Sequence, residues 1–303
     1  QPRSRGLGDV YKRQDLKSKF KSITYKESME KYGNDRPDLR FNLELKTITE
    51  IFKDTKFKVF KDVVSADGSI KCIKVNGSNM NRKILDDLTS FAQEHGAKGL
   101  AWIKVLETEL QSPILKFFSE QEINSLKERL ELSLNDIVFF GAGELETVNN
   151  YMSAVRNKLG EDLGLISQDS YEFVWITDFP LFLKVDDNIT STHHPFTMPQ
   201  NEALNESNLT SQLSQAYDIV LNGTEIGGGS IRIHKRDLQE KIFKILGISK
   251  EEYESNFGYL LNALESGTPP HGGLALGLDL SLIHISEPTR PRLMSYAVFC
   301  LKK

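Results

Sequence analysis

The chain has 303 residues, 39% of them hydrophobic and 26% charged, and its 38 basic and 42 acidic side chains give a formal net charge of −4. This length allows two domains. The longest apolar runs, such as residues 137–140, are far too short to span a bilayer, so no membrane-spanning helix is expected.

Near the N-terminal end, residues 32–40 are predicted to form a loop, because Gly33-Asn34 and Arg36-Pro37 interrupt any regular pattern. A charge-rich loop is usually a solvated turn. Its residue types alone therefore give it no individual catalytic role.

The character of the sequence changes between Ile51 and about Val155. Within this segment, residues 68–75 alternate like a strand, residues 82–94 have helical spacing, and residues 98–105 return as a strand. This succession predicts a β–α–β unit.

A second α/β unit is predicted to follow. Ser119 and Glu122 form a capping box at the start of a helix that runs to about Leu132. A strand at residues 137–140 and a helix from about 145 to 159 come next. Together the two units could bury a core of their own.

No residue of this segment forms an obvious reaction centre. Lys98, Trp102 and Lys104 could contact nucleic acid or a partner, but a strand with a buried aromatic side chain and solvated lysines explains the same pattern. The segment is therefore interpreted as structural.

The stretch 216–234 sets two acids and an arginine around a glycine run. Its Asn222-Gly223 dipeptide accepts positive φ at both positions and predicts a two-residue hairpin turn. Counted from this turn, Asp218 lies opposite Gly227 and shares a face with Glu225 as a diagonal neighbour.

Two carboxylates aimed at one spot, Asp218 and Glu225, can hold Mg²⁺, which prefers oxygen ligands and bridges to substrate phosphates. Gly227 to Gly229 let a ligand approach the backbone, and Arg232 could fork onto a carboxylate or phosphate. Strict alternation puts Arg232 on the face opposite Glu225, so a shared site requires a bulge, which the glycine run could supply. On spacing alone, a solvated hairpin remains the alternative.

Three further segments carry long motifs: Thr177-Asp-Phe-Pro-Leu-Phe182, Ser191-Thr-His-His-Pro-Phe-Thr197 and Phe257-Gly-Tyr-Leu-Leu-Asn-Ala-Leu-Glu-Ser-Gly-Thr-Pro-Pro-His-Gly-Gly-Leu-Ala-Leu-Gly-Leu-Asp279. Together with the hairpin, they agree in order and spacing with bacterial-type aspartyl-tRNA synthetases, a class II family that the chain resembles. Because several long motifs agree, the resemblance is specific.

The resemblance implies that Asp218 and Glu225 bind ATP and Mg²⁺, and that Arg232 grips the side-chain carboxylate of aspartate. The family's substrate histidine falls on His193, with His194 beside it. Without the resemblance, this His-His pair would be interpreted as part of a surface loop.

Residues 272–279 resemble the third class II motif, so Gly277, Leu278 and Asp279 are assigned to the ATP site. In the family an adenine-stacking arginine should follow Asp279, and this sequence has Leu280 instead. The first two class II motifs are missing from the chain.

Both ends of the chain, residues 1–14 and 280–303, read like translated sequencing adapters, so the natural segment is taken to be 15–279. Without these tails the chain keeps 30 basic and 40 acidic residues, a formal net charge of −10. Such an acidic body is not typical of a free-standing nucleic-acid binder. With Cys300 in a tail, Cys72 has no partner for a disulfide, which fits a reducing cytoplasm.

The resemblance implies an α+β fold in which residues 15–50 and 156–279 form part of a class II synthetase-like antiparallel sheet with flanking helices. Residues 51–155 resemble the GAD-type α/β domain that these enzymes carry as an insert, chiefly through His95-Gly-Ala-Lys-Gly-Leu-Ala-Trp102. The loop at 32–40 resembles the segment after the second class II motif and is expected near the active site.

The implied activity is that of an aspartate–tRNA ligase, a cytoplasmic homodimer that joins L-aspartate to tRNA(Asp) with ATP. The chain is expected to be an inactive fragment of it. One alternative is a non-catalytic binding or regulatory paralogue, which a genuine Leu280 would favour. A sister class II enzyme for asparagine or lysine is the other, and the insert and the string from Gly227 to His234 argue against it.

Overall fold

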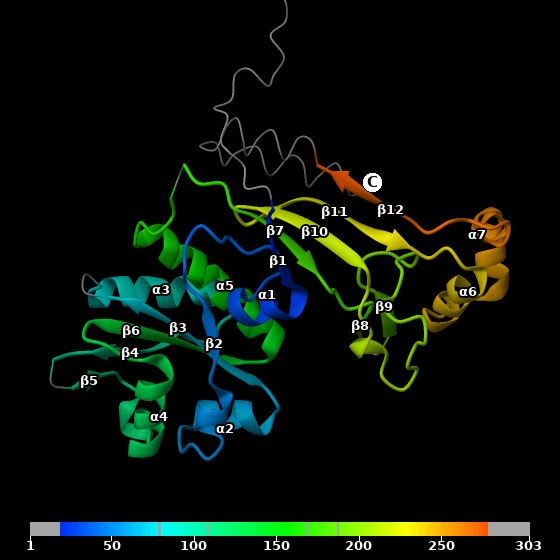
Figure 1. Ribbon diagram of the computed structural model, residues 1–303. Helices are drawn as coiled ribbons and strands as arrows, with labels where there is room; N and C mark the ends of the chain where they lie inside the picture. The colour runs from blue at the N-terminus through cyan, green and yellow to red at the C-terminus, as the bar shows by residue number, and fades with distance from the viewer. Residues whose placement is uncertain (1–18, 78–79, 108, 168, 187, 278–303) are drawn as a thin grey trace, which may run out of the picture.

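The computed structural model describes residues 19–77, 80–107, 109–167, 169–186 and 188–277. Within them, two five-stranded sheets and a separate two-stranded hairpin carry helices on and between the sheets (Figure 1). The predicted tails, 1–14 and 280–303, lie outside these residues. No helix in the described part of the chain is long and apolar enough to cross a membrane.

Sheet A contains the predicted hairpin and consists, in spatial order, of β1 (Lys21–Thr24), β7 (Phe173–Thr177), β10 (Ala216–Leu221), β11 (Thr224–Arg232) and β12 (His271–Leu276). β1 and β7 are parallel, and every other neighbouring pair is antiparallel. The predicted α+β class with a mainly antiparallel sheet is therefore confirmed.

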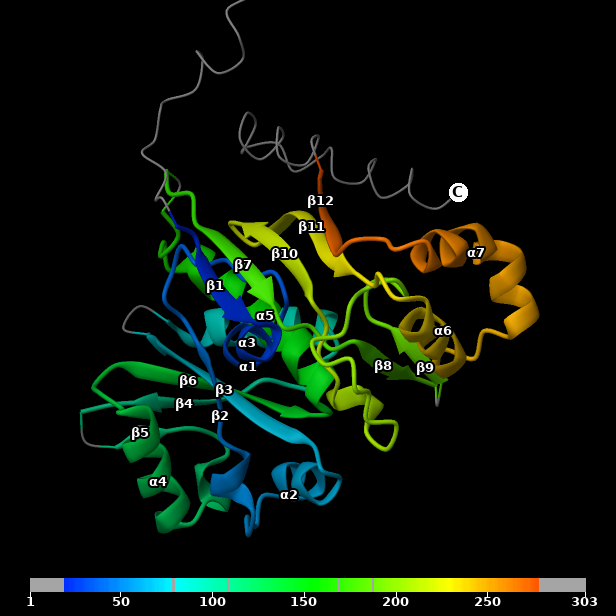
Figure 2. The same ribbon diagram turned by 45° about the vertical axis from the view of Figure 1, so that its right-hand side comes forward.

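Helix α1 (Tyr25–Tyr32) follows β1 directly and lies between the two sheets (Figures 1 and 2). It buries Tyr32 with Ile23, Val174 and Ile176 against one face of sheet A. The remaining elements of this half are β8 (Phe182–Val185), β9 (Asn188–Ser191), the 3₁₀ turn η4 (Leu209–Ser211), α6 (Arg236–Ile245) and α7 (Lys250–Glu265).

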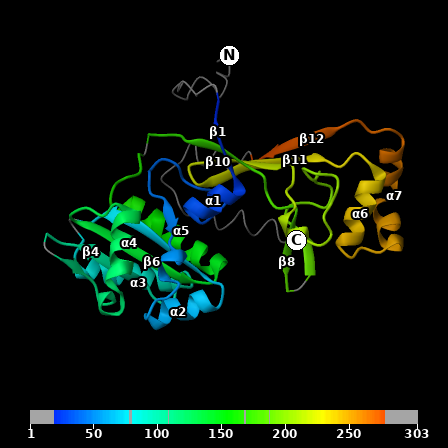
Figure 3. The ribbon, with the colours of Figure 1, turned by 60° about the horizontal axis from the view of Figure 1, so that its bottom comes forward.

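Sheet B is antiparallel between all neighbours and lies to one side of sheet A (Figure 3). Its strands, in spatial order, are β2 (Leu45–Thr47), β3 (Ser69–Asn76), β6 (Asp136–Gly143), β4 (Ala101–Val105) and β5 (Leu110–Gln111). The helical elements around it are η2 (Thr49–Phe52), α2 (Lys58–Ser65), α3 (Arg82–Glu94), η3 (Leu115–Phe117), α4 (Glu120–Leu130) and α5 (Leu145–Asp162).

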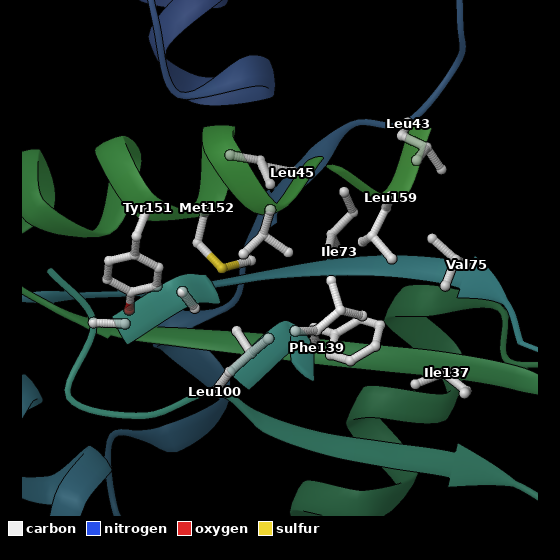
Figure 4. Packing of buried hydrophobic residues seen from close by; sticks show 14 of the residues in the cluster. Leu43, Leu45, Ile73, Val75, Leu100, Ile137, Phe139, Tyr151, Met152 and Leu159 are labelled. Atoms are coloured by element: carbon white, nitrogen blue, oxygen red, sulfur yellow. The ribbon is translucent and has the colours of Figure 1, made fainter. Parts of the chain in front are cut away.

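The apolar run of β6 explains how sheet B buries both faces. Ile137 and Phe139 pack with α3 and α5, whereas Val138 and Phe140 pack with α2 and α4. Figure 4 shows Met152 of α5 among the side chains of the first of these faces. Because successive strand residues point to opposite faces, a continuous apolar run requires cover on both sides.

The predicted elements of this half agree with the structure. The helix predicted at 82–94 is α3, and the strand predicted at 68–75 corresponds to β3. β3 and β4 run parallel as a β–α–β unit requires, but β6 lies between them and pairs with both, so the unit is split.

The capping box at the start of α4 is confirmed. The Glu122 amide donates to the Ser119 hydroxyl at 3.2 Å, and the Ser119 amide donates to Glu122 Oε2 at 2.6 Å. The helix ends at Leu130, two residues earlier than predicted, because Glu131 adopts a left-handed conformation with φ 49°.

Two elements cross the predicted domain limits. β2 lies in the range 15–50 but pairs with β3 of sheet B. α5 runs without interruption from 145 to 162, through the predicted limit between 155 and 156. The domain limits themselves stay a prediction.

Candidate active site

The hairpin of β10 and β11 turns at Asn222 and Gly223, which have φ 50° and 84° as the dipeptide predicts. Beyond the first two pairs the register shifts by one residue, so Asp218 lies opposite Gly228. The predicted pairing of Asp218 with Gly227 is therefore wrong. One extra residue in β11 between Glu225 and Gly227 causes the shift, which is a β-bulge.

The bulge brings the charged side chains of both strands to one face of sheet A. Glu225 pairs with Val220, two residues from Asp218, so the two acids share a face. Beyond the bulge, Ser230 pairs with Ala216 on that same face, and Arg232 follows two residues later. The prediction that a shared site requires a bulge is confirmed.

Because Gly228 has no side chain, the carboxylates of Asp218 and Glu225 can both occupy the space above it. A Cβ there would collide with Asp218 Oδ1 and lie 3.5 Å from Glu225 Oε1. Gly227 and Gly229 face the neighbouring strand, because a Cβ on either would strike the backbone of β12. Only the middle glycine of the run therefore opens toward the carboxylates.

The carboxylate pair is electrostatically unfavourable in the absence of a cation. Burial raises the pKa of Glu225, and the negative charges of Asp218 and Asp35 raise it further. Asp218 is 7% exposed, and its Oδ2 lies 3.4 Å from His193 Nε2. A group that lowered this repulsion would stabilise Glu225 in its charged form.

Asp35 belongs to the predicted loop at 32–40, which the structure places against the hairpin. A Cβ on Gly223 would lie 3.2 Å from the Asp38 Cβ. Asp35 and Arg36 are both close enough to Glu225 to influence its pKa, in opposite directions. Sequence reasoning gave these residues no individual catalytic role, although the resemblance predicted that their loop lies near the active site.

The segment with His193 and His194 is fixed by aromatic packing. The His193 ring meets Phe179 edge to face at a centroid distance of 4.5 Å. His194 Nδ1 accepts the Phe196 amide at 3.3 Å, and Phe196 packs on Phe243 of α6. Helix α6, which follows β11, therefore helps to hold the histidine segment in place.

The same segment extends the sheet beside Arg232. The Met198 amide donates to the Ile231 carbonyl at 2.9 Å, and Thr197 bridges Arg232. Burial lowers the pKa of His194, and the positive charge of Arg232 lowers it further. Both effects favour the neutral form of the His194 imidazole.

A cavity of about 350 Å³ joins these groups. In the part of the chain that the structure describes, the Arg232 side chain forms no ion pair, so its guanidinium is available to an anion in the cavity. Leu278 and Asp279 lie outside the described residues. The residues around the cavity are His193, His194, Thr197, Asp218, Glu225, Ile226, Gly227, Gly228, Gly229, Ser230, Arg232, Ala275 and Gly277.

Sequence reasoning missed Thr197 and Ser230, which line this cavity. Both are 2% exposed, and their hydroxyl oxygens lie 3.4 Å apart. The available signal was spacing, because Ser230 stands two residues before Arg232 on the same strand.

The donor set suits a weakly held magnesium ion and not a fully protein-bound metal. No group of three or more metal-ligating His, Cys, Asp or Glu side chains occurs among the described residues. Mg²⁺ commonly takes one or two carboxylates and completes its shell with water and substrate phosphates. Asp218 and Glu225, open to the cavity over Gly228, fit that pattern.

A second hollow, of about 920 Å³, lies in the half built on sheet B and contains none of the predicted site residues. Trp102 lines it and packs against the apolar cluster of α3 and α5. The Lys104 ammonium donates to the Met80 carbonyl at 3.1 Å. Trp102 is thus only partly buried, and the Lys104 ammonium is hydrogen-bonded within the fold, so the structural interpretation of this segment stays a prediction.

Relatives of known sequence match most of the chain. It is 50% identical over 281 residues to an aspartate–tRNA(Asp/Asn) ligase of Aquifex aeolicus, covering 88% of this chain and 47% of the relative. It is 47% identical over 270 residues to the aspartate–tRNA ligase of Listeria welshimeri, covering 87% and 46%. The chain thus spans about half the length of the curated relatives it matches.

Among solved structures, the aspartyl-tRNA synthetase of Entamoeba histolytica aligns over 72% of this chain and 40% of that chain, with 13% identity and a TM-score of 0.30. Residues 4–288 match the sequence profile of the class II tRNA synthetases for D, K and N. The chain therefore belongs to this class II tRNA synthetase family.

Proposed function

We propose that the chain is part of the catalytic domain of a cytoplasmic aspartate–tRNA ligase, which activates L-aspartate with ATP and transfers it to tRNA(Asp). One observation carries the proposal: a single cavity holds a carboxylate pair, an arginine that forms no ion pair with any described residue, and a backbone cleared by glycine. The match to aspartate–tRNA ligases over most of the chain supports it.

Asp218 and Glu225 hold Mg²⁺ in this proposal, and the ion neutralises phosphate charge when it is bound. Gly228 lets ATP approach these acids, and Gly277 lies at the same cavity. The reaction requires no enzyme nucleophile, because aspartate itself attacks the α-phosphate and pyrophosphate leaves. The residues of the site therefore act by positioning and by charge complementarity.

Arg232 selects the substrate. Its planar guanidinium donates two parallel hydrogen bonds to the side-chain carboxylate of aspartate, which an amide side chain cannot accept in the same way. Neutral His194 beside it adds no competing positive charge. His193, which contacts Phe179 and Asp218, lines the same cavity and is assigned to the substrate.

Titration calorimetry of L-aspartate with the chain tests the role of Arg232. Arg232→Lys is expected to weaken binding about 10-fold or more, because hydrogen bonds to charged groups contribute about 1.5–3 kcal/mol. Arg236→Lys is the matched control, since Arg236 forms ion pairs with Glu240, Glu254 and Glu265 away from the cavity. Equal affinities in the two variants would contradict the assignment.

The chain alone is expected to show no aspartate-dependent pyrophosphate exchange. It lacks the first two class II motifs and the arginine of the third motif, where Leu280 stands. The intact homodimer would supply these groups. Measurable exchange by the 303-residue chain would show that the expectation of inactivity is wrong.

A non-catalytic binding paralogue is the second candidate, and Leu280 is the observation that favours it. Sequencing the source locus across both ends of this sequence distinguishes the ligase from the paralogue. An arginine codon after Asp279 supports the ligase, whereas a genuine leucine with no class II motifs upstream supports the paralogue.

A further inference from the structure

Arg156 of α5 is fully buried and donates hydrogen bonds to the backbone of one segment, residues 38–43. Its Nε donates to the Leu43 carbonyl at 2.5 Å, and its Nη2 donates to the carbonyls of Asp38 at 2.8 Å and Phe41 at 3.2 Å. Its exposed fraction is 0%. Three of its hydrogen bonds therefore hold the chain between residues 38 and 43.

Burying this guanidinium is costly, because none of the described carboxylates forms an ion pair with it. Burial lowers its pKa to about 10. Tyr32 and Phe41 cover its two sides, with the guanidinium carbon 4.8 Å and 4.0 Å from the ring centroids. A neutral side chain could fill this space, but it could not donate to three carbonyls at once.

The segment held by Arg156 continues into the site. Asp38 lies against Gly223, the hairpin turn residue that stands two positions before Glu225. Earlier in the loop, the Asn34 side chain donates to the Ser153 hydroxyl of α5. Contacts therefore run from α5, through the loop, to the strand that carries one of the two site acids.

A second buried cation fixes the start of the same loop. Lys71 of β3 is 2% exposed, and its ammonium donates to the carbonyls of Met29 at 3.0 Å and Glu30 at 3.2 Å, at the end of α1. The Gly33 amide closes that helix end through the Met29 carbonyl. Sheet B and its helix thus hold both ends of the loop.

We propose that Arg156 is a positioning residue of the site: by holding the backbone at 38–43, it presses the loop at 33–40 onto the Asn222-Gly223 turn and so fixes Glu225 relative to Asp218. The half of the molecule built on sheet B then sets the geometry of the carboxylate pair on sheet A. The contacts of Arg156 with the loop do not depend on which reaction the site performs. Only the expected effect on the binding of ATP and Mg²⁺ rests on the proposed function.

Hydrogen–deuterium exchange of the full chain tests the proposal directly. Arg156→Lys keeps the charge, but its compact ammonium lacks the planar, spread donors with which the guanidinium reaches the carbonyls of Asp38, Phe41 and Leu43. We expect exchange about 10-fold faster for amides of residues 33–43 and of the hairpin turn, with α6 and α7 unchanged. Arg236→Lys is the matched control and should leave the loop and the turn as in the wild type.

The same variants are compared for affinity toward ATP with Mg²⁺. Arg156→Lys is expected to weaken binding about 3- to 10-fold, and Arg236→Lys to leave it unchanged. If the wild-type chain binds no ATP while the exchange pattern appears as expected, the carboxylate pair does not bind ATP with Mg²⁺ in this chain, and the positioning role stands on the exchange pattern alone.

Two results would overturn the positioning role. One is unchanged exchange in the loop and turn of Arg156→Lys, and the other is uniform acceleration over the whole chain, which would make Arg156 only a stabiliser of the fold. If Arg156→Lys does not fold, Ser153→Ala replaces it, because it removes only the bond to Asn34. Faster exchange of residues 33–36 and of the turn then supports the proposal, and unchanged exchange overturns it.

Discussion

Sheets A and B have the same number of strands but bury different groups. Sheet B packs apolar clusters against both faces. One face of sheet A instead holds Asp218, Glu225 and Arg232 around a cavity, where the two acids repel each other and the arginine forms no ion pair with a described carboxylate. We infer that sheet B stabilises the molecule, whereas sheet A keeps unfavourable charges in place for a ligand.

The largest effect should come from the core of sheet B. Phe139 is 0% exposed, so Phe139→Ala is expected to lower the free energy of unfolding by about 3–5 kcal/mol. Val59→Ala is the control, because Val59 is 55% exposed and should change stability by only about 0.5 kcal/mol. Chemical denaturation measures both. Similar losses in the two variants would contradict the assignment of stability to sheet B.

Lys71 is a buried charged residue of sheet B and should make the free energy of unfolding depend on pH. Burial lowers its pKa from 10.5 to about 8, an effect that Glu30 opposes. Between these values the unfolded chain binds more protons than the folded one, so stability rises with pH. Between pH 8 and 10.5, we expect the free energy of unfolding of the wild type to rise by up to about 3 kcal/mol relative to that of Lys71→Met. A pH-independent difference between their denaturation curves would contradict this.

On sheet A, Gly228→Ala should damage binding more than folding. The new methyl group would push the Asp218 carboxylate away from Glu225. We expect affinity for ATP with Mg²⁺, measured by calorimetry, to fall about 10-fold or more, which is about 1.4 kcal/mol. Gly99→Ala is the control, because a Cβ there meets no atom within 4 Å. Equal binding by both variants would show that the space over Gly228 is not used.

The smallest effect should be a gain in stability from Glu225→Gln. Because the pKa of Glu225 is raised in the fold, chiefly by burial, the folded state binds its proton more tightly, and stability falls as pH rises through the raised pKa. Glu225 is exposed by its surface area, so solvent screening limits the gain at neutral pH to no more than about 1 kcal/mol. Thermal unfolding with and without Mg²⁺ measures it, beside Glu94→Gln as an exposed control. A loss of stability in Glu225→Gln would contradict the unfavourable pairing.

The sequence by itself determined the elements whose causes are local. The turn at Asn222-Gly223, the capping box at Ser119 and Glu122, and helix α3 all appear where they were predicted, because neighbouring residues decide backbone conformation there. The bulge in β11 was also foreseen as a requirement.

The glycine run was expected to supply this bulge, but the extra residue is Ile226, just before the run. Asp218 therefore lies opposite Gly228, where the count from the turn predicts Gly227. Residue counting assumes unbroken pairing, whereas β10 and β11 take their register also from β7 and β12 on their outer sides. A one-residue shift exchanges the faces of a strand, so only the assembled sheet decides which charges meet.

Tertiary structure alone decided what surrounds the carboxylate pair. Arg156 and Asp38 are 118 residues apart in sequence, and no local pattern indicates that one holds the backbone of the other. A buried arginine on an amphipathic helix resembles any solvated one in sequence. Arg156 can position the loop at 33–40 only because α5, α1 and this loop pack together. That packing depends on contacts between residues far apart in the sequence, which bury the side chains of both sheets.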